Sequence, residues 1–303
     1  MQGRAIVQFI FFGNYFYGFC AVALSVEGWL KQHNQSMPWS LCTLLFPLTV
    51  WFYTHSYQRS NPQDIHNIRV AWYLKHKKII GWLQGLHLII ALASLLTLLN
   101  RAGVDALTYM PPLSWFLLAI FPAVAMLYYG ADHNLFKKIS LRQWGWLKPF
   151  TIGFVWAGMV TVYPSIFHDL ENHLPYSLNR IDYMLFLKNF LFVSLIGIMF
   201  DIKDHAHDHH QSLRTFIVRA GLRKTIFMIL VPLSVFAIAA FLADGMGRNQ
   251  SEIKVMLTIT PFVLLILVAL SLIKRRRLLY YLVVVDGLLL VKALCGIIAV
   301  EYF

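Results

Sequence analysis

Three aspartates stand at a spacing that could do metal chemistry. Asp201, Asp204 and Asp208 occupy positions i, i+3 and i+7, which share one face of a helix. Carboxylates gathered on one face repel each other unless a cation lies among them, and hard oxygen ligands that leave room for water and phosphate suit Mg²⁺. A solvated helix beside a membrane, with its acids balanced by Lys203 and Arg214, explains the spacing equally well. Both interpretations stay open.

Histidines in the same stretch allow a different metal chemistry. His205, His209 and His210 match one box of the membrane di-iron desaturases and hydroxylases. Such centres draw on about eight histidines from several boxes, because each iron needs several imidazoles. The remaining histidines are scattered along the chain and form no second box. A di-iron oxygenase is therefore the third interpretation of the chain.

The elements that must position these residues cross a membrane. Of the 303 residues, 58% are hydrophobic and 13% are charged, which is too little charge to cover a soluble domain of this length. About 20 apolar residues cross a bilayer as a helix, and a helix satisfies its own backbone in lipid. The sequence thus predicts an all-α, polytopic membrane bundle, a single domain over 1–303 of about nine transmembrane helices near 7–27, 38–57, 79–99, 112–130, 146–166, 183–200, 222–243, 253–273 and 278–300.

The basic residues are unevenly distributed between the two sides of this bundle. Nineteen of the 26 lysines and arginines fall at the N-terminus or in the even-to-odd connections, and five fall in the opposite connections. Basic residues collect on the cytoplasmic side, so we expect the N-terminus inside and the C-terminus outside, in a bacterial inner (plasma) membrane. The net charge of +12 is then topogenic. It predicts anionic membrane lipids as partners and excludes nucleic acid.

The aspartate-rich stretch resembles a known family. With Ser212, Thr215 and Gly221 downstream, the three aspartates are similar to the second aspartate-rich motif of the UbiA prenyltransferase superfamily. The nine expected spans, with long cytoplasmic connections at 58–78 and 201–224, also resemble that family. The resemblance implies transfer of an isoprenyl group from its diphosphate to a lipophilic (aromatic or quinone-precursor) acceptor. It also implies that Asp201, Asp204 and Asp208 hold Mg²⁺.

The first motif of that family, Asn-Asp-x-x-Asp-x-x-x-Asp, is missing at the end of the second block. Asn61, Asp64 and Asn67 stand there instead. Arg69 lies just beyond, and a guanidinium can bind phosphate directly. We therefore expect Arg69, Lys203 and Arg214 to be basic partners of the diphosphate. A topogenic role for these charges is the alternative.

Two further sets of residues could line a substrate cavity. The family's tyrosine-to-lysine motif has a partial counterpart in Tyr128, with Lys137 and Lys138 further along. Asn14 and Asp286 lie roughly 10–15 Å in from the cytoplasmic face, at 1.5 Å per residue, and polar groups inside spans are costly and usually functional. A structural hydrogen bond between helices is the other explanation.

The sequence therefore supports one main hypothesis and one close alternative. The main hypothesis is a magnesium-dependent prenyltransferase. The alternative is a non-catalytic lipid-binding or assembly protein with the same fold, because one of the two aspartate-rich motifs is missing.

Overall fold

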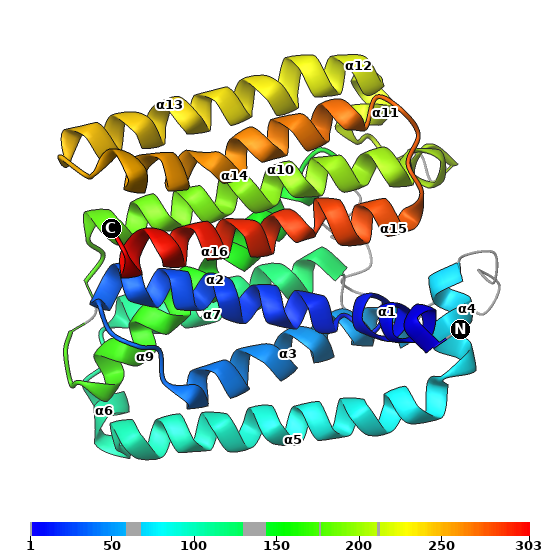
Figure 1. Cartoon of the computed structure of the whole chain (residues 1–303). Coiled ribbons are helices and arrows are strands. Elements are labelled where there is room, and N and C mark those ends of the chain that lie inside the picture. Colours follow the sequence, from blue (N-terminus) through cyan, green and yellow to red (C-terminus); the bar gives the residue numbers. More distant parts are fainter. Residues whose placement is uncertain (1, 59–67, 130–143, 176, 211–212) are drawn as a thin grey trace.

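The structure is a computed structural model that describes residues 2–58, 68–129, 144–175, 177–210 and 213–303. Within these ranges the chain is helical and contains no strand (Figure 1). The elements are α1 (Gln2–Phe12), α2 (Tyr15–His33), α3 (Trp39–Gln58), α4 (Ile68–Lys75), α5 (Lys77–Ala102), α6 (Val104–Thr108), α7 (Pro112–Tyr129), α8 (Lys148–Ala157), η4 (Gly158–Val162), α9 (Tyr163–Glu171), α10 (Arg180–His210), α11 (Phe216–Ala220), α12 (Leu222–Thr225), η5 (Ile226–Leu230), α13 (Val231–Gly247), α14 (Glu252–Ser271), α15 (Leu278–Tyr280), η6 (Tyr281–Val285) and α16 (Gly287–Glu301).

Each of the nine expected blocks is a helical segment in the described residues. Six of these segments are long and apolar enough to cross a membrane. A seventh meets the same condition if α1 and α2, which are bent by 57° against each other, count as one span. The two remaining segments are α3 and the shorter apolar helix α7. The expected all-α, multi-pass architecture is confirmed.

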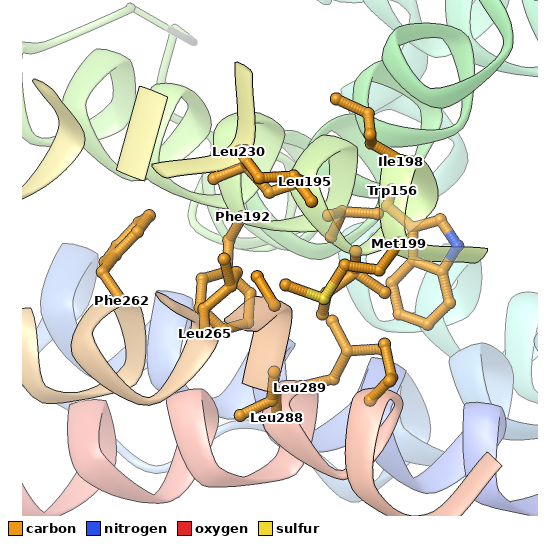
Figure 2. Close-up of a cluster of buried hydrophobic side chains, with 14 of the residues drawn as sticks. Trp156, Phe192, Leu195, Ile198, Met199, Leu230, Phe262, Leu265, Leu288 and Leu289 are labelled. Carbon is orange, nitrogen blue, oxygen red and sulfur yellow. The ribbon is translucent and has the colours of Figure 1, made fainter. Parts of the chain in front are cut away.

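Apolar side chains cover the outside of the bundle. On α5 the exposed fractions reach 84% for Trp82 and 66% for Ile89. Such large apolar groups are normally buried in a water-soluble protein, and here they face the place that lipid would occupy. The main core packs Phe192 of α10 against α14 and α16, around Phe262 and Leu289 (Figure 2).

Different termini and connections lie at the two ends of the bundle. The N-terminus, α4 and α11 lie at one end, which we call the cap end, and the C-terminus and the α13–α14 junction lie at the opposite end (Figure 1). The described parts of the two long connections, expected at 58–78 and 201–224, therefore both lie at the cap end. An odd number of crossings would also place the two termini at opposite ends.

Within the ranges that the structure describes, three spans contain a π-helical turn, namely η4, η5 and η6. Such turns interrupt an α-helix locally and change the direction of the side chains that follow. η6 ends immediately before Asp286, whose backbone N–H donates to the carbonyl of Tyr281 over 3.0 Å. The π turn therefore sets the direction of this buried carboxylate.

Candidate functional site

The aspartates lie on α10 at the cap end of the bundle. This helix continues without a break from Arg180 to His210, so the block expected at 183–200 and the aspartate-rich stretch belong to one helix. Asp201 is fully buried and Asp204 is partly exposed. Asp208 belongs to the same helix. Its side chain, like Lys137 and Lys138, lies outside the described residues.

A lysine that the sequence analysis did not select contacts the first aspartate. Lys148 begins α8, and its Nζ lies 2.7 Å from Asp201 Oδ1. A methyl group on Gly197 would lie 2.9 Å from Cβ of Pro149, so the glycine allows the start of α8 to approach α10 closely. Gly197 and Asp201 are four residues apart and share a helix face. The close approach at Gly197 therefore brings Lys148 within reach of Asp201.

The second aspartate has a cation of its own. Lys203 Nζ lies 2.8 Å from Asp204 Oδ1. Among the described side chains, no three histidines, cysteines or acidic residues lie close enough together to hold a metal ion. Mg²⁺ usually takes one or two protein carboxylates, and water and substrate phosphate complete its shell. Asp201 and Asp204 are two carboxylates of that kind, and Lys148 and Lys203 provide positive charge beside them.

The remaining predicted residues are dispersed around this end. Arg214 is exposed just before α11, where the hydroxyl of Thr215 accepts from the Val218 N–H over 3.4 Å. Tyr128 is buried near the end of α7. His205 is exposed on α10.

Asn14 and Arg69 belong to one buried hydrogen-bond network. Asn14 breaks the helix between α1 and α2 with a left-handed φ of 64°, a conformation that asparagine tolerates better than most residues. Its Nδ2 donates to Thr54 Oγ1 over 3.1 Å and to Tyr73 Oη over 3.0 Å. Arg69 donates to Asn14 Oδ1 and, over 3.1 Å, to the carbonyl of Phe12.

Arg69 therefore caps the end of a helix. It also donates to the carbonyl of Phe11 over 3.3 Å and to Tyr57 Oη over 3.0 Å. Phe11 and Phe12 end α1, where carbonyls lack intrahelical partners. Only 7% of Arg69 is exposed, because these bonds hold it inside. These bonds favour a structural role for Arg69 over direct contact with a diphosphate, and they favour the structural alternative for Asn14.

Tyr73 completes the same network from α4, outside the spans. Its hydroxyl donates to the carbonyl of Phe12 over 2.7 Å, and its ring stacks on Tyr57 with centroids 5.2 Å apart. Burial raises the pKa of Tyr73 to about 12. The phenol therefore keeps its proton and remains a donor at any physiological pH.

Asp286 lies buried among aromatic rings. Tyr17 Oη donates to Asp286 Oδ2 over 2.8 Å. The Tyr17 ring stacks on Tyr53 at 4.8 Å, and Trp156 Nε1 donates to Tyr53 Oη over 2.6 Å. The hydroxyl of Tyr17 thus joins this carboxylate to a cluster of three aromatic rings.

Sequence reasoning selected Asp286 as a costly polar residue within a span but missed the rings around it. The faces of aromatic rings attract cations, so Tyr17, Tyr53 and Trp156 could stabilise a positively charged group. No spacing marks these three among the 46 aromatic residues of the chain (23 Phe, 14 Tyr and 9 Trp). Only the packing of α2, α3 and α8 brings them together.

Comparisons with known proteins give one informative match. No family model matches the chain, and no curated protein matches it. The solved structure of a digeranylgeranylglyceryl phosphate synthase from membranes superimposes with a TM-score of 0.55 and covers 98% of each chain. The expected UbiA-like fold is confirmed. At 13% sequence identity, the likeness establishes the fold alone.

Proposed function

We propose that this integral, multi-pass membrane protein transfers an isoprenyl group from its diphosphate to a lipophilic acceptor, such as an aromatic quinone precursor. The observation that carries the proposal is the acidic face of α10, which lies with basic residues at the cap end. The fold shared with a membrane synthase supports the same conclusion. Asp201, Asp204 and Asp208 are the proposed Mg²⁺ ligands.

Aspartates and lysines at the cap end would bind the diphosphate in two different ways. Asp201 and Asp204 would hold the ion, and Lys148 and Lys203 would bind the oxygens of the diphosphate. Mg²⁺, when bound, would neutralise the charge that develops on the leaving diphosphate. The bond between the allylic carbon and oxygen breaks, and its electron pair leaves with the diphosphate.

The aromatic cluster would receive the other product of that cleavage. The allylic carbon becomes electron-deficient, and the faces of Tyr17, Tyr53 and Trp156 offer it cation–π stabilisation. The acceptor then forms a bond to this carbon and loses a proton. The aromatic cluster lies farther along the spans than the aspartates, so the prenyl chain would extend from the cap end into the bundle.

A second candidate function rests on a specific observation. Lys148 and Lys203 already neutralise Asp201 and Asp204, which is also the arrangement expected of a stable protein without catalysis. Such a protein would bind a prenyl lipid and leave it unchanged. Binding of Mg²⁺ separates the two functions, because a catalytic site should bind Mg²⁺ and diphosphate together.

The first prediction tests the enzyme directly. Purified protein with Mg²⁺, a set of isoprenyl diphosphates and aromatic acceptors should release pyrophosphate. Asp204→Asn should lower the release roughly 10–100-fold, because a charged interaction contributes about 1.5–3 kcal/mol. Thermal shifts should show that Mg²⁺ and isoprenyl diphosphate stabilise the wild type synergistically and the variant only additively.

The control is Asp105→Asn, which removes an exposed acid of α6 at the opposite end of the bundle. It should leave both release and synergy unchanged. Absence of pyrophosphate release, with prenyl-lipid binding retained, would favour the non-catalytic protein. Release that is equal in the wild type and Asp204→Asn would contradict the assigned role of α10.

A further inference from the structure

A second charged region lies at the end of the bundle opposite the aspartates. A cavity of about 260 Å³ is formed there by α2, α10, α13, α14 and α16. Its charged lining consists of Lys31, Lys188, Arg248, Lys254 and a single acid, Asp244. Arg248 is exposed at its edge, so the cavity reaches the surface.

The position of these cations is unexpected for a membrane protein. Positive residues are scarce on the side away from the cytoplasm, and only five stand in the connections expected there. Three of the five, Lys31, Arg248 and Lys254, line this one cavity. A fourth, Arg180, donates to Asp244 over 2.8 Å. A role in setting the membrane orientation does not explain why these four cations lie around one cavity.

Two of the lining lysines, Lys31 and Lys188, also belong to a cluster of one buried acid and three lysines. Glu27 is fully buried. Its Oε1 lies 2.6 Å from Lys31 Nζ, and its Oε2 lies 2.8 Å from Lys292 Nζ. Lys188 Nζ is farther away, at 3.4 Å from Oε1. One carboxylate cannot balance three ammonium groups, and buried charge is costly unless it is paired.

Lys188 is the cation for which this imbalance matters most. Among the described residues, its hydrogen-bond acceptor is the Glu27 oxygen that already accepts from Lys31 at a shorter distance. Lys188 is only 4% exposed, and it lines the cavity. Negative charge on the cavity side would stabilise the charged form of this ammonium group.

The acids near the cavity do not supply that charge. Both oxygens of Asp244 are bound, one by Arg180 and the other by Arg248 at 2.9 Å. Asp182, on the same helix as Lys188, accepts from Gln32 over 2.8 Å and from the Asn179 N–H over 2.9 Å. The positive excess thus remains within the cavity lining.

The uncharged part of the lining is mostly apolar, with three polar residues, Asn34, Gln250 and Thr258, beside the apolar ones. Aliphatic and aromatic side chains of α2, α10, α13 and α16 form the apolar part, namely Leu30, Ile181, Met184, Leu185, Phe241 and Val300. Ligand sites commonly combine an apolar wall with a few convergent polar groups. A lining that combines cationic and apolar side chains suits a molecule with an anionic head and a hydrocarbon chain.

We infer that this cavity binds the phosphate headgroup of an anionic lipid, with Lys188 beneath the phosphate and Lys254 beside it. Lysine binds phosphate as a point charge, so the arrangement needs no fixed planar geometry. The apolar wall would contact the first carbons of the chain. The site lies at the other end of the bundle from the aspartates and does not depend on the proposed prenyl transfer.

The experiment compares three probes on the purified full-length chain in neutral detergent. Short-chain phosphatidic acid carries both the phosphate and the apolar chains, inorganic phosphate carries only the charge, and the matching diacylglycerol carries only the chains. Native mass spectrometry and titration by thermal shift measure the binding. Phosphatidic acid should bind at least about tenfold more tightly than either of the others.

Two variants and one control assign the binding to this cavity. Lys188→Gln and the partly exposed Lys254→Gln should each weaken phosphatidic acid binding roughly tenfold or more, as expected for loss of a charged hydrogen bond. Lys224→Gln removes an exposed lysine of α12 at the cap end and should have no effect. If Lys188→Gln fails to fold, Lys254→Gln still tests the site.

Three results would overturn the inference. Equal affinity for inorganic phosphate and phosphatidic acid would exclude the lipid as the source of the phosphate. Unchanged binding in Lys254→Gln and in folded Lys188→Gln would exclude the cavity. An equal loss in Lys224→Gln would show that general surface charge attracts the lipid.

Discussion

Arg69 shows that a residue whose sequence position suggests phosphate binding can instead form hydrogen bonds that stabilise the fold. Its position beyond the second span is where a basic residue could meet a diphosphate. The structure instead binds its guanidinium to the last carbonyls of α1 and to Asn14. A planar group with five donors suits this task, because it can satisfy several acceptors at once.

Replacing Arg69 should therefore affect stability first. Arg69→Ala removes several charged hydrogen bonds, each contributing about 1.5–3 kcal/mol, so its melting temperature in detergent should fall well below that of the wild type. Arg69→Lys should recover little of this loss, since an ammonium group cannot reproduce the fork. Arg223→Ala, which removes an exposed arginine of α12, is the control. A stable Arg69→Ala protein that lost only pyrophosphate release would restore the diphosphate role.

At this scale, the sequence predicts local geometry and misses partners from elsewhere in the chain. The shared face of Asp201 and Asp204 follows from helical periodicity, so it could be predicted. The contact of Lys148 with Asp201 depends on how closely α8 approaches α10, which no local spacing contains. Asn14 could be selected as a costly polar group, but its left-handed backbone could not be deduced from that cost.

The helices were easier to predict from the sequence than the bends and π turns that interrupt them. Long apolar blocks must become helices in lipid, and each of the nine predicted blocks is one. The 57° bend between α1 and α2 has no proline to mark it. η6 also lacks proline, whereas η4 and η5 are followed by Pro164 and Pro232 at the second residue of the next helix. Proline alone does not locate these interruptions.

One glycine of α16 allows a test of how closely two elements pack. A methyl group on Gly296 would lie 2.2 Å from Cδ of Glu27, so Gly296→Ala must displace the buried carboxylate from Lys292. Overpacking of this kind costs about 1–3 kcal/mol, and we expect a lower melting temperature in detergent. Gly287→Ala on the same helix meets nothing within 4 Å, so its melting temperature should match or exceed that of the wild type. Equal behaviour of the two variants would contradict the packing around Glu27.

At the scale of the whole molecule, the distribution of charge predicts an orientation. Nineteen basic residues on one side and five on the other favour a cytoplasmic cap end. Reporter fusions after residue 303 and within 274–277 should therefore report opposite sides of the membrane, with 274–277 inside. If both reporters lay on the same side, the odd number of crossings would be wrong.

The three π turns have a consequence for how the length of this chain can vary. Each π turn closes its hydrogen bond over one residue more than an α turn does, so η4, η5 and η6 each hold one extra residue. Deleting that residue would restore an α-helix without rotating the two halves of the span relative to each other. Elsewhere in a span, the same deletion would turn every later side chain by about 100°, since a turn takes 3.6 residues. Homologous chains could therefore lose single codons at these three places and still bury the same faces.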